Sequence, residues 1–236
     1  MNNINYNRYF VLIKKKKILF QAFDSNNKVI LTKEIFINNP SQDNIYGAIK
    51  NFLEKNIFEI EKKLNDFIKE IYIIFESDLF FVVGSSIKHN FQKSNFEFSN
   101  IHDTLLEIKN QFKKYSPQDE IIHMVINKYI LGQNEYKILP KPTNSENLAI
   151  QVNFICLRNE IVDDLKEIFL KYQISVNKIL SCDYLKGLKG LEDYNYENIF
   201  KLADYSINGL HKNEVLLSNK TPKNLGFFEK FFNFFS

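Results

Sequence analysis

Strand-like and helix-like segments alternate along this 236-residue chain, and that alternation limits its fold more than any other feature. Runs rich in β-branched and aromatic residues predict strands, whereas apolar residues at helical spacing predict amphipathic helices. The predicted strands cover residues 8–23 (with a lysine-rich turn at 14–17), 29–37, 70–75, 79–83, 90–98, 120–130, 148–157 and 175–181, and the predicted helices cover residues 43–58, 99–115, 160–172, 182–191 and 198–210. Gly84, Ser85 and Ser86 are interpreted as a break between two strands. Because both kinds of element are mixed throughout, the expected fold class is α/β (α+β).

Charge and cysteine content argue against several classes of protein. The formal net charge is +3 and only Arg8 and Arg158 are arginines, whereas nucleic-acid-binding surfaces usually cluster arginine and lysine. Cys156 and Cys182 are too few and too far apart for a disulfide framework or a zinc site, and Cys156 is expected in the core. No secretory signal or long apolar run is evident, so we expect a cytoplasmic protein without nucleic-acid partners.

The sequence contains no recognisable catalytic constellation. Neither a G-x-G-x-x-G motif nor a Walker-type loop is present to hold phosphate. The four histidines fall in different segments, and His123, within a predicted strand, is interpreted as a hydrogen-bonded structural residue. We therefore expect no enzyme activity, no cofactor and no metal site.

Residues 225–235, called the tail below, carry six phenylalanines and one leucine. At about 100° per residue, these apolar side chains fall on one half of a helical wheel and the polar ones on the other. The segment is too short to span a bilayer but suits a helix that lies in its interface. Lys220, Lys223 and Lys230 give a positive bias that favours anionic lipids. The predicted membrane-binding residues are Leu225, Phe227, Phe228, Lys230, Phe231, Phe232, Phe234 and Phe235.

A helix docked on the protein's own core is the alternative interpretation of the tail. Phenylalanine is a mediocre helix former, and so short a helix is marginal in water, so we expect order only on an accepting surface. Residues 218–224 are polar, contain Pro222 and are predicted to form a short flexible tether. Because each buried Phe contributes about 2 kcal/mol at most, one copy should bind a membrane reversibly.

Three stretches of the chain resemble a known family. Residues 121–132, IIHMVINKYILG, look like the strand pattern I-L-H-V-I-P-x-x-Y-x-V-D-G, and residues 138–142, ILPKP, are similar to the turn I-x-x-P-x-G. Residues 147–155, NLAIQVNFI, resemble the strand R-L-E-V-x-V-H-I-I. These patterns are those of the FtsA family, membrane-tethered bacterial cell-division proteins of the actin-like superfamily. The tail is similar in kind and position to that family's membrane-targeting helix.

The resemblance implies a partial actin-like ATPase fold with a single lobe. Residues 1–83 and 160–218 would form a discontinuous subdomain like the family's 1A, and residues 84–159 an inserted subdomain like its 1C. Residues 219–236 would be the tether and the amphipathic membrane-targeting helix. The second lobe would be missing between about residues 190 and 198.

The sequence departs from the family at the first phosphate loop. Where the family has an Asp-x-Gly-Ser/Thr turn, this chain has Ile13, four lysines (Lys14, Lys15, Lys16, Lys17) and Ile18. The family closes its nucleotide cleft between two lobes, so a one-lobed chain without this loop is expected not to bind ATP. The family's docking surface for the tubulin-like protein FtsZ also lies in the missing lobe, which leaves contact with FtsZ uncertain.

The predicted function is therefore a non-enzymatic, FtsA-like adaptor in bacterial cell division. It would be peripheral on the inner face of the cytoplasmic membrane, at the division site. Its partners would be the lipid surface and division proteins, reached by self-association or through the 1C-like region. The alternatives are a PilM-type scaffold of a pilus or secretion platform, a divergent ATP-binding protein of the actin superfamily, and an unrelated α+β binding protein.

Overall fold

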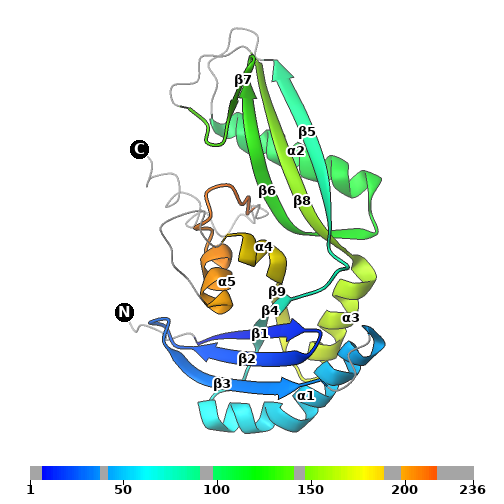
Figure 1. Ribbon diagram of the computed structural model, residues 1–236, viewed down its shortest axis with the longest axis vertical. Coiled ribbons are helices and arrows are strands. Elements are labelled where there is room, and N and C mark those ends of the chain that lie inside the picture. The colour runs from blue at the N-terminus through cyan, green and yellow to red at the C-terminus, as the bar shows by residue number, and fades with distance from the viewer. Residues whose placement is uncertain (1–6, 38–41, 91–97, 141–146, 189–197, 217–236) are drawn as a thin grey trace.

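A computed structural model describes residues 7–37, 42–90, 98–140, 147–188 and 198–216 (Figure 1). Within these ranges the chain forms two β-sheets at opposite ends of an elongated molecule, with helices packed on them (Figure 1). The predicted mixed α/β class is confirmed. The tail and the proposed site of the missing lobe lie outside the described residues.

The first sheet has the strand order β3-β2-β1-β4-β9. Its strands are β1 (Arg8–Lys14), β2 (Lys17–Phe23), β3 (Val29–Phe36), β4 (Glu70–Phe75) and β9 (Ser175–Ser181). The first three form an antiparallel meander, whereas β4 pairs parallel with β1, and β9 pairs parallel with β4. Parallel strands are usually buried on both faces, which explains why β1 and β4 consist of nearly continuous apolar residues.

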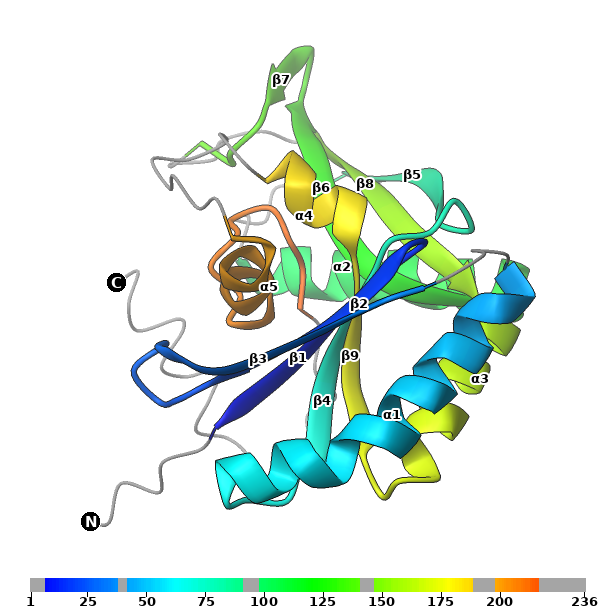
Figure 2. The same ribbon diagram turned by 60° about the horizontal axis from the view of Figure 1, so that its bottom comes forward.

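Two pairs of helices cover the two faces of the first sheet (Figure 2). One face packs on α1 (Gln42–Leu64) and α3 (Asn159–Leu170), and the other on α4 (Cys182–Gly187) and α5 (Ile199–Ile207). In the predicted helix at 43–58, helical spacing places Ile49, Phe52 and Leu53 on one apolar face, and all three are at most 1% exposed. The sequence leaves open a broken or bent continuation beyond residue 58, and the helix continues unbroken to Leu64.

The second sheet is antiparallel throughout, with the order β5-β8-β6-β7. Its strands are β5 (Phe81–Asn90), β6 (Asp119–Leu131), β7 (Asn134–Tyr136) and β8 (Asn147–Arg158), and helix α2 (Phe98–Tyr115) packs on one face. The ring centroids of Phe112 on α2 and Phe154 on β8 lie 4.8 Å apart. Cys156 is fully buried in this core, as predicted.

The predicted break at Gly84, Ser85 and Ser86 is wrong. Strand β5 continues through these residues because every position from Phe81 to Asn90 pairs with β8. Glycine weakens a strand but does not end it where a long partner strand is already in place. The predicted strand at 90–98 starts at the last residue of β5 and ends at the first residue of α2, and residues 91–97 lie outside the description.

The second sheet is inserted into the first unit between β4 and α3. The chain changes sheets between Phe75 and Phe81, so the predicted boundary at residue 84 lies within β5. Ile122 of β6 and Leu157 of β8 belong to the core of the first sheet. The two sheets are therefore joined by shared apolar packing as well as by the two chain connections.

Candidate functional site

The predicted membrane-binding residues, Leu225 to Phe235, lie outside the described residues. The description ends at Leu216, a few residues before the predicted tether. Within the described ranges, no helix combines the length and hydropathy that a bilayer-spanning segment needs. The structure describes how the body holds residues 213–215, which precede the tether.

A short segment before the tail is attached to the free edge of β6. Val125 and Glu214 form an antiparallel bridge. The N–H of Ile126 donates to the carbonyl of Asn213 at 2.8 Å, and the N–H of Val215 donates to the carbonyl of Met124 at 2.8 Å. The chain is therefore held by backbone hydrogen bonds on both sides of Glu214.

The side chain of Glu214 is buried between the two sheets, with 1% of it exposed. Its carboxylate accepts hydrogen bonds from His123 Nδ1 at 2.8 Å, Ser206 Oγ at 2.6 Å and the Tyr184 hydroxyl at 3.1 Å. Lys178 Nζ lies 3.4 Å away and supplies the opposite charge. These donors come from β6, α5, α4 and β9, so one carboxylate connects elements of both sheets.

The hydrogen bonds of His123 define its tautomer. Its Nε2 accepts the backbone N–H of Ser181 at 3.0 Å, so the ring proton sits on Nδ1 and is donated to Glu214. Burial lowers the pKa of His123, against the opposite effect of its bond to Glu214, and the ring is neutral. His123 is thus the structural histidine that its strand position predicted.

Glu214 itself stays ionised. Burial raises the pKa of this carboxyl, but the hydrogen bonds from His123 and Ser206 and the charge of Lys178 outweigh it and hold the pKa below its usual range. Tyr184 also bonds His211 Nδ1 at 3.1 Å, and burial raises the pKa of its phenol. Each of these side chains is engaged with its neighbours, an arrangement that holds the fold together rather than one that presents a reactive group.

A second charged cluster lies where the carboxyl ends of β1, β4 and β9 meet. The resemblance places the phosphate loop at the β1–β2 turn of this edge. The turn consists of Lys15 and Lys16, and Lys15 pairs with Asp78. Neither turn residue has a positive φ, so the tight turn that glycines allow in a phosphate loop is not formed here.

Lysine side chains neutralise the acidic groups along this edge. Lys186 Nζ lies 2.6 Å from Glu76 and 3.0 Å from Asp183, and Lys14 lies 3.6 Å from Glu76. Burial raises the pKa of Glu76, but Lys186 and Lys14 outweigh it and lower the value. Lys14, Lys15 and Lys186 are therefore each paired with a local carboxylate.

Glu76, Cys182 and Asp183 offer possible metal-ligand atoms within 4.8 Å of one another. Their surroundings do not fit a metal ion, because the ammonium of Lys186 already bonds both carboxylates. Burial also raises the pKa of the Cys182 thiol, whereas a metal requires the thiolate.

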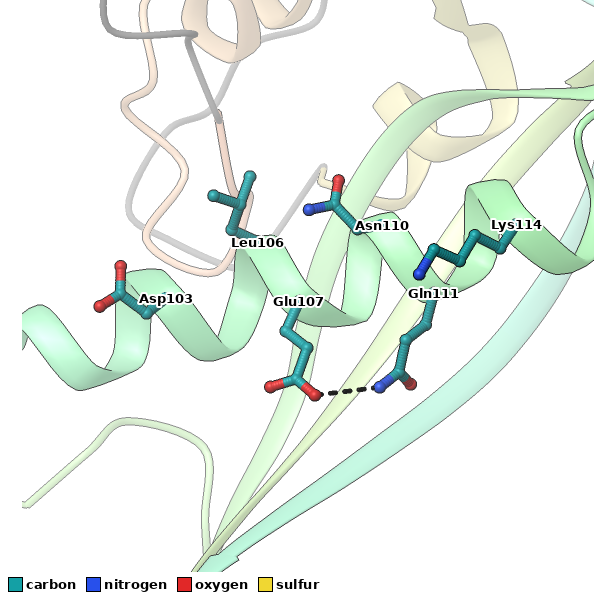
Figure 3. Close-up of a pocket in the computed structure, with 6 residues that line it drawn as sticks. All are labelled: Asp103, Leu106, Glu107, Asn110, Gln111 and Lys114. Carbon is teal, nitrogen blue, oxygen red and sulfur yellow. Dashed lines mark hydrogen bonds between the residues drawn. The ribbon is translucent and has the colours of Figure 1, made fainter.

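The outward face of α2 borders a shallow hollow of about 480 Å³, and Figure 3 shows the side chains that line it. All of them come from this one helix, and Gln111 donates a hydrogen bond to Glu107 at 3.1 Å. Ligand pockets usually enclose their ligand with groups from several elements. We assign no ligand to this hollow. Its lining residues are Asp103, Leu106, Glu107, Asn110, Gln111 and Lys114.

Sequence reasoning did not identify Glu214. Residues 213–216 read Asn-Glu-Val-Leu, without the alternation of a half-buried strand, and nothing local marks a buried carboxylate. Its partners lie up to 91 positions away in the chain. Tertiary packing alone brings them together.

Neither a protein-family model nor a curated protein matches this sequence. Among solved structures, the cytoplasmic domain of EpsL, an inner-membrane component of the Vibrio cholerae type II secretion system, is 7% identical with a TM-score of 0.35. That similarity covers 76% of this chain and 59% of EpsL. A Bacteroides thetaiotaomicron protein with an actin-like ATPase fold is 12% identical with a TM-score of 0.32, over 78% of this chain and 55% of that one.

A chain from a PilM–PilN type IV pilus biogenesis complex is 12% identical with a TM-score of 0.40, over 78% of this chain and 50% of that one. This chain thus spans between 50% and 59% of the length of the three matched chains. At such low identities and TM-scores, these similarities assign neither a family nor a function.

Proposed function

We propose that this chain is a non-enzymatic, FtsA-like adaptor that attaches to the inner face of the cytoplasmic membrane and holds division proteins there. The observation that carries the proposal is the attachment of residues 213–215 to β6 directly before the tether and the tail. This attachment ties the segment that precedes the tether to both sheets, so pulling on a membrane-bound tail would act on the folded body. The strand patterns of residues 121–155 supply the link to the actin-like superfamily.

The lysine–carboxylate pairs at the carboxyl edge of the first sheet support a role without nucleotide. Phosphate binding there would require Lys14 and Lys186 to leave Glu76, and no glycine-rich loop faces the site within the described residues. We expect no heat of ATP binding in a calorimetric titration with magnesium. Micromolar affinity would instead favour the divergent ATP-binding protein.

A scaffold of the PilM type is the second candidate. Such scaffolds carry the same extra subdomain, and a sheet with a covering helix is inserted here between β4 and α3. They reach the membrane through partners, whereas this chain has its own phenylalanine-rich tail. A fluorescent fusion discriminates the two, because a mid-cell band supports division and polar or scattered foci support the platform.

Liposome sedimentation tests the anchor. The substitutions Phe228→Glu and Phe232→Glu together should abolish sedimentation, because they place two charges on the apolar face of the tail. Phe58 and Phe67 are 77% and 76% exposed on the body, so Phe58→Glu with Phe67→Glu is a matched control that should sediment normally. Undiminished sedimentation of the tail variant would reject the proposed membrane anchor.

The protein partners require a separate experiment. A tagged copy crosslinked in its native cell should capture division proteins if the FtsA-like assignment is right. Capture of pilus or secretion proteins alone would favour the scaffold. Recovery of FtsZ would show that this contact survives without a second lobe.

A further inference from the structure

Two segments share the free edge of β6. Strand β7 pairs with the distal part, where Tyr136 lies opposite Tyr129. The segment before the tail bonds the proximal part, from Ile126 to Met124. Both run antiparallel to β6, and their attachment points are about 10 Å apart along it, at about 3.3 Å per residue.

Three large aliphatic side chains next to these attachments face solvent. Ile138 follows β7 and is 65% exposed, while Leu210 and Leu216 flank the bridge to β6 and are 55% and 39% exposed. Leu210 and Leu216 belong to one place, because a Cβ on Gly209 would lie 3.2 Å from Leu216 Cδ1. We call Ile138, Leu210 and Leu216 the β6 fringe.

The exposed charges within residues 136–140 and 208–216 are positive. Lys137 and Lys212 are exposed there, whereas Glu214 is buried in its hydrogen-bond network. Glu135, on the neighbouring β7, forms an ion pair with Lys128. Aliphatic side chains beside lysines match the interface of an anionic bilayer.

The chain itself brings the fringe close to lipid. Residues 217–224 separate Leu216 from the first apolar residue of the tail, a span of about 27 Å at full extension. A tail lying in the interface therefore confines this edge of the body near the same surface. Because the bridge and Glu214 fix residues 213–215, the described part of the chain ends beside the edge of β6.

We propose that the β6 fringe is a second lipid contact, which orients the body with the β6 edge toward an anionic bilayer. This inference rests on the membrane anchoring proposed for the tail. The tail supplies most of the affinity, and the fringe adds a smaller contribution that exists only when the tail is bound.

The test uses the full chain and vesicles of phosphatidylglycerol and phosphatidylethanolamine. The double variant Ile138→Glu, Leu210→Glu should raise the lipid concentration for half-maximal sedimentation about fivefold to tenfold. The matched control is Leu170→Glu with Phe58→Glu, whose side chains are 63% and 77% exposed on α3 and α1, the helices that cover the face of the first sheet opposite α5 (Figure 2). Thermal midpoints of both variants should equal that of the parent, because every substituted side chain is exposed.

Each outcome is decisive. Weaker binding by the fringe variant, with a control like the parent, supports the second contact. Equal binding by the parent, the fringe variant and the control would overturn the second contact while leaving the proposed tail anchor intact. Tighter binding by the fringe variant would also overturn it, because it would show that the tail docks on the fringe. If the parent itself does not sediment, the proposed anchor fails and the fringe inference fails with it.

A spectroscopic measurement checks the orientation directly. An environment-sensitive dye on Ile138→Cys should shift to the blue when vesicles are added, and the same dye on Leu170→Cys should not. The native Cys156 and Cys182 are buried and do not compete for the label. Equal responses at the two positions would contradict the proposed orientation.

Discussion

At the scale of single residues, Glu214 is a buried side chain that hydrogen-bonds groups from elements of both sheets. A buried carboxylate is costly unless donors surround it, and here His123, Ser206 and Tyr184 all point their hydrogens at it. Removing the charge leaves those donors facing an acceptor that cannot satisfy them all. The residue also belongs to the segment that leads into the tail, so its contribution to stability and its position in the proposed anchor coincide.

Glu214→Gln should lower the free energy of unfolding by about 2 kcal/mol, because the amide places its own N–H groups among existing donors. Denaturant titration at neutral pH measures this change. The control is Glu34→Gln, which breaks a half-exposed pair with Lys17 and should change stability by less than about 1 kcal/mol. Equal losses in the two variants would contradict the role assigned to Glu214.

The pH dependence of stability follows from the same carboxyl. Its pKa in the folded protein is lowered from the ordinary value of 4.5, so the stabilisation is present above pH 4.5 and is lost as the pH falls below it. Between pH 5 and pH 2, the free energy of unfolding should therefore fall more steeply for the parent than for Glu214→Gln. Equal slopes in the two proteins would contradict this assignment.

At the scale of elements, the end of α5 controls how the chain turns toward β6. Gly209 has a φ of 69°, and its N–H donates to the carbonyl of Ser206 at 3.1 Å. The next N–H, of Leu210, donates to the carbonyl of Tyr205 at 3.2 Å. This left-handed residue ends the helix and directs the following residues to the bridge with Val125.

Gly209→Ala should destabilise the protein by about 1–2 kcal/mol, because alanine is strained at this φ and its Cβ would press on Leu216. Gly132→Ala is the matched control, since Gly132 has a φ of 62° and open space around the added Cβ. Thermal unfolding of both variants separates backbone strain from crowding. A loss at Gly132 as large as that at Gly209 would show that the contact with Leu216 contributes nothing.

Local sequence patterns predicted the helices and strands well where the apolar residues followed a single spacing, helical or alternating. The face of α1 with Ile49 and Phe52 followed from helical spacing, and β9 has the predicted bounds. The local patterns failed to predict that β5 continues through Gly84, because its pairing with β8 depends on residues about seventy positions away. The short strand β7 was also missed, since its pairing with β6 after the Gly132 turn covers three residues.

At the scale of the whole molecule, the described body contains three hydrophobic cores, and the tail is proposed to pack on lipid rather than on any of them. Each face of the first sheet and one face of the second sheet has an apolar cluster. We therefore expect the stability of the body to be separable from the tail.

Deletion of residues 222–236 should leave the thermal midpoint nearly unchanged, because the tail is proposed to pack on lipid rather than protein. A longer deletion, of residues 213–236, serves as the comparison. It also removes Glu214 and should lower the thermal midpoint by several degrees. Differential scanning calorimetry measures both. A large drop in the shorter deletion would mean that the tail belongs to the core.

The sequence by itself determined the fold class, most of the elements, and the amphipathic character of residues 225–235. These properties depend on the spacing of apolar side chains along a short stretch of chain, which is visible without knowing its surroundings. Tertiary structure alone decided that Glu214 joins His123, Ser206 and Tyr184, and that the chain reaches the tail from the edge of β6. Those contacts join residues far apart in the chain, and long-range pairing of this kind leaves no periodic pattern in the sequence.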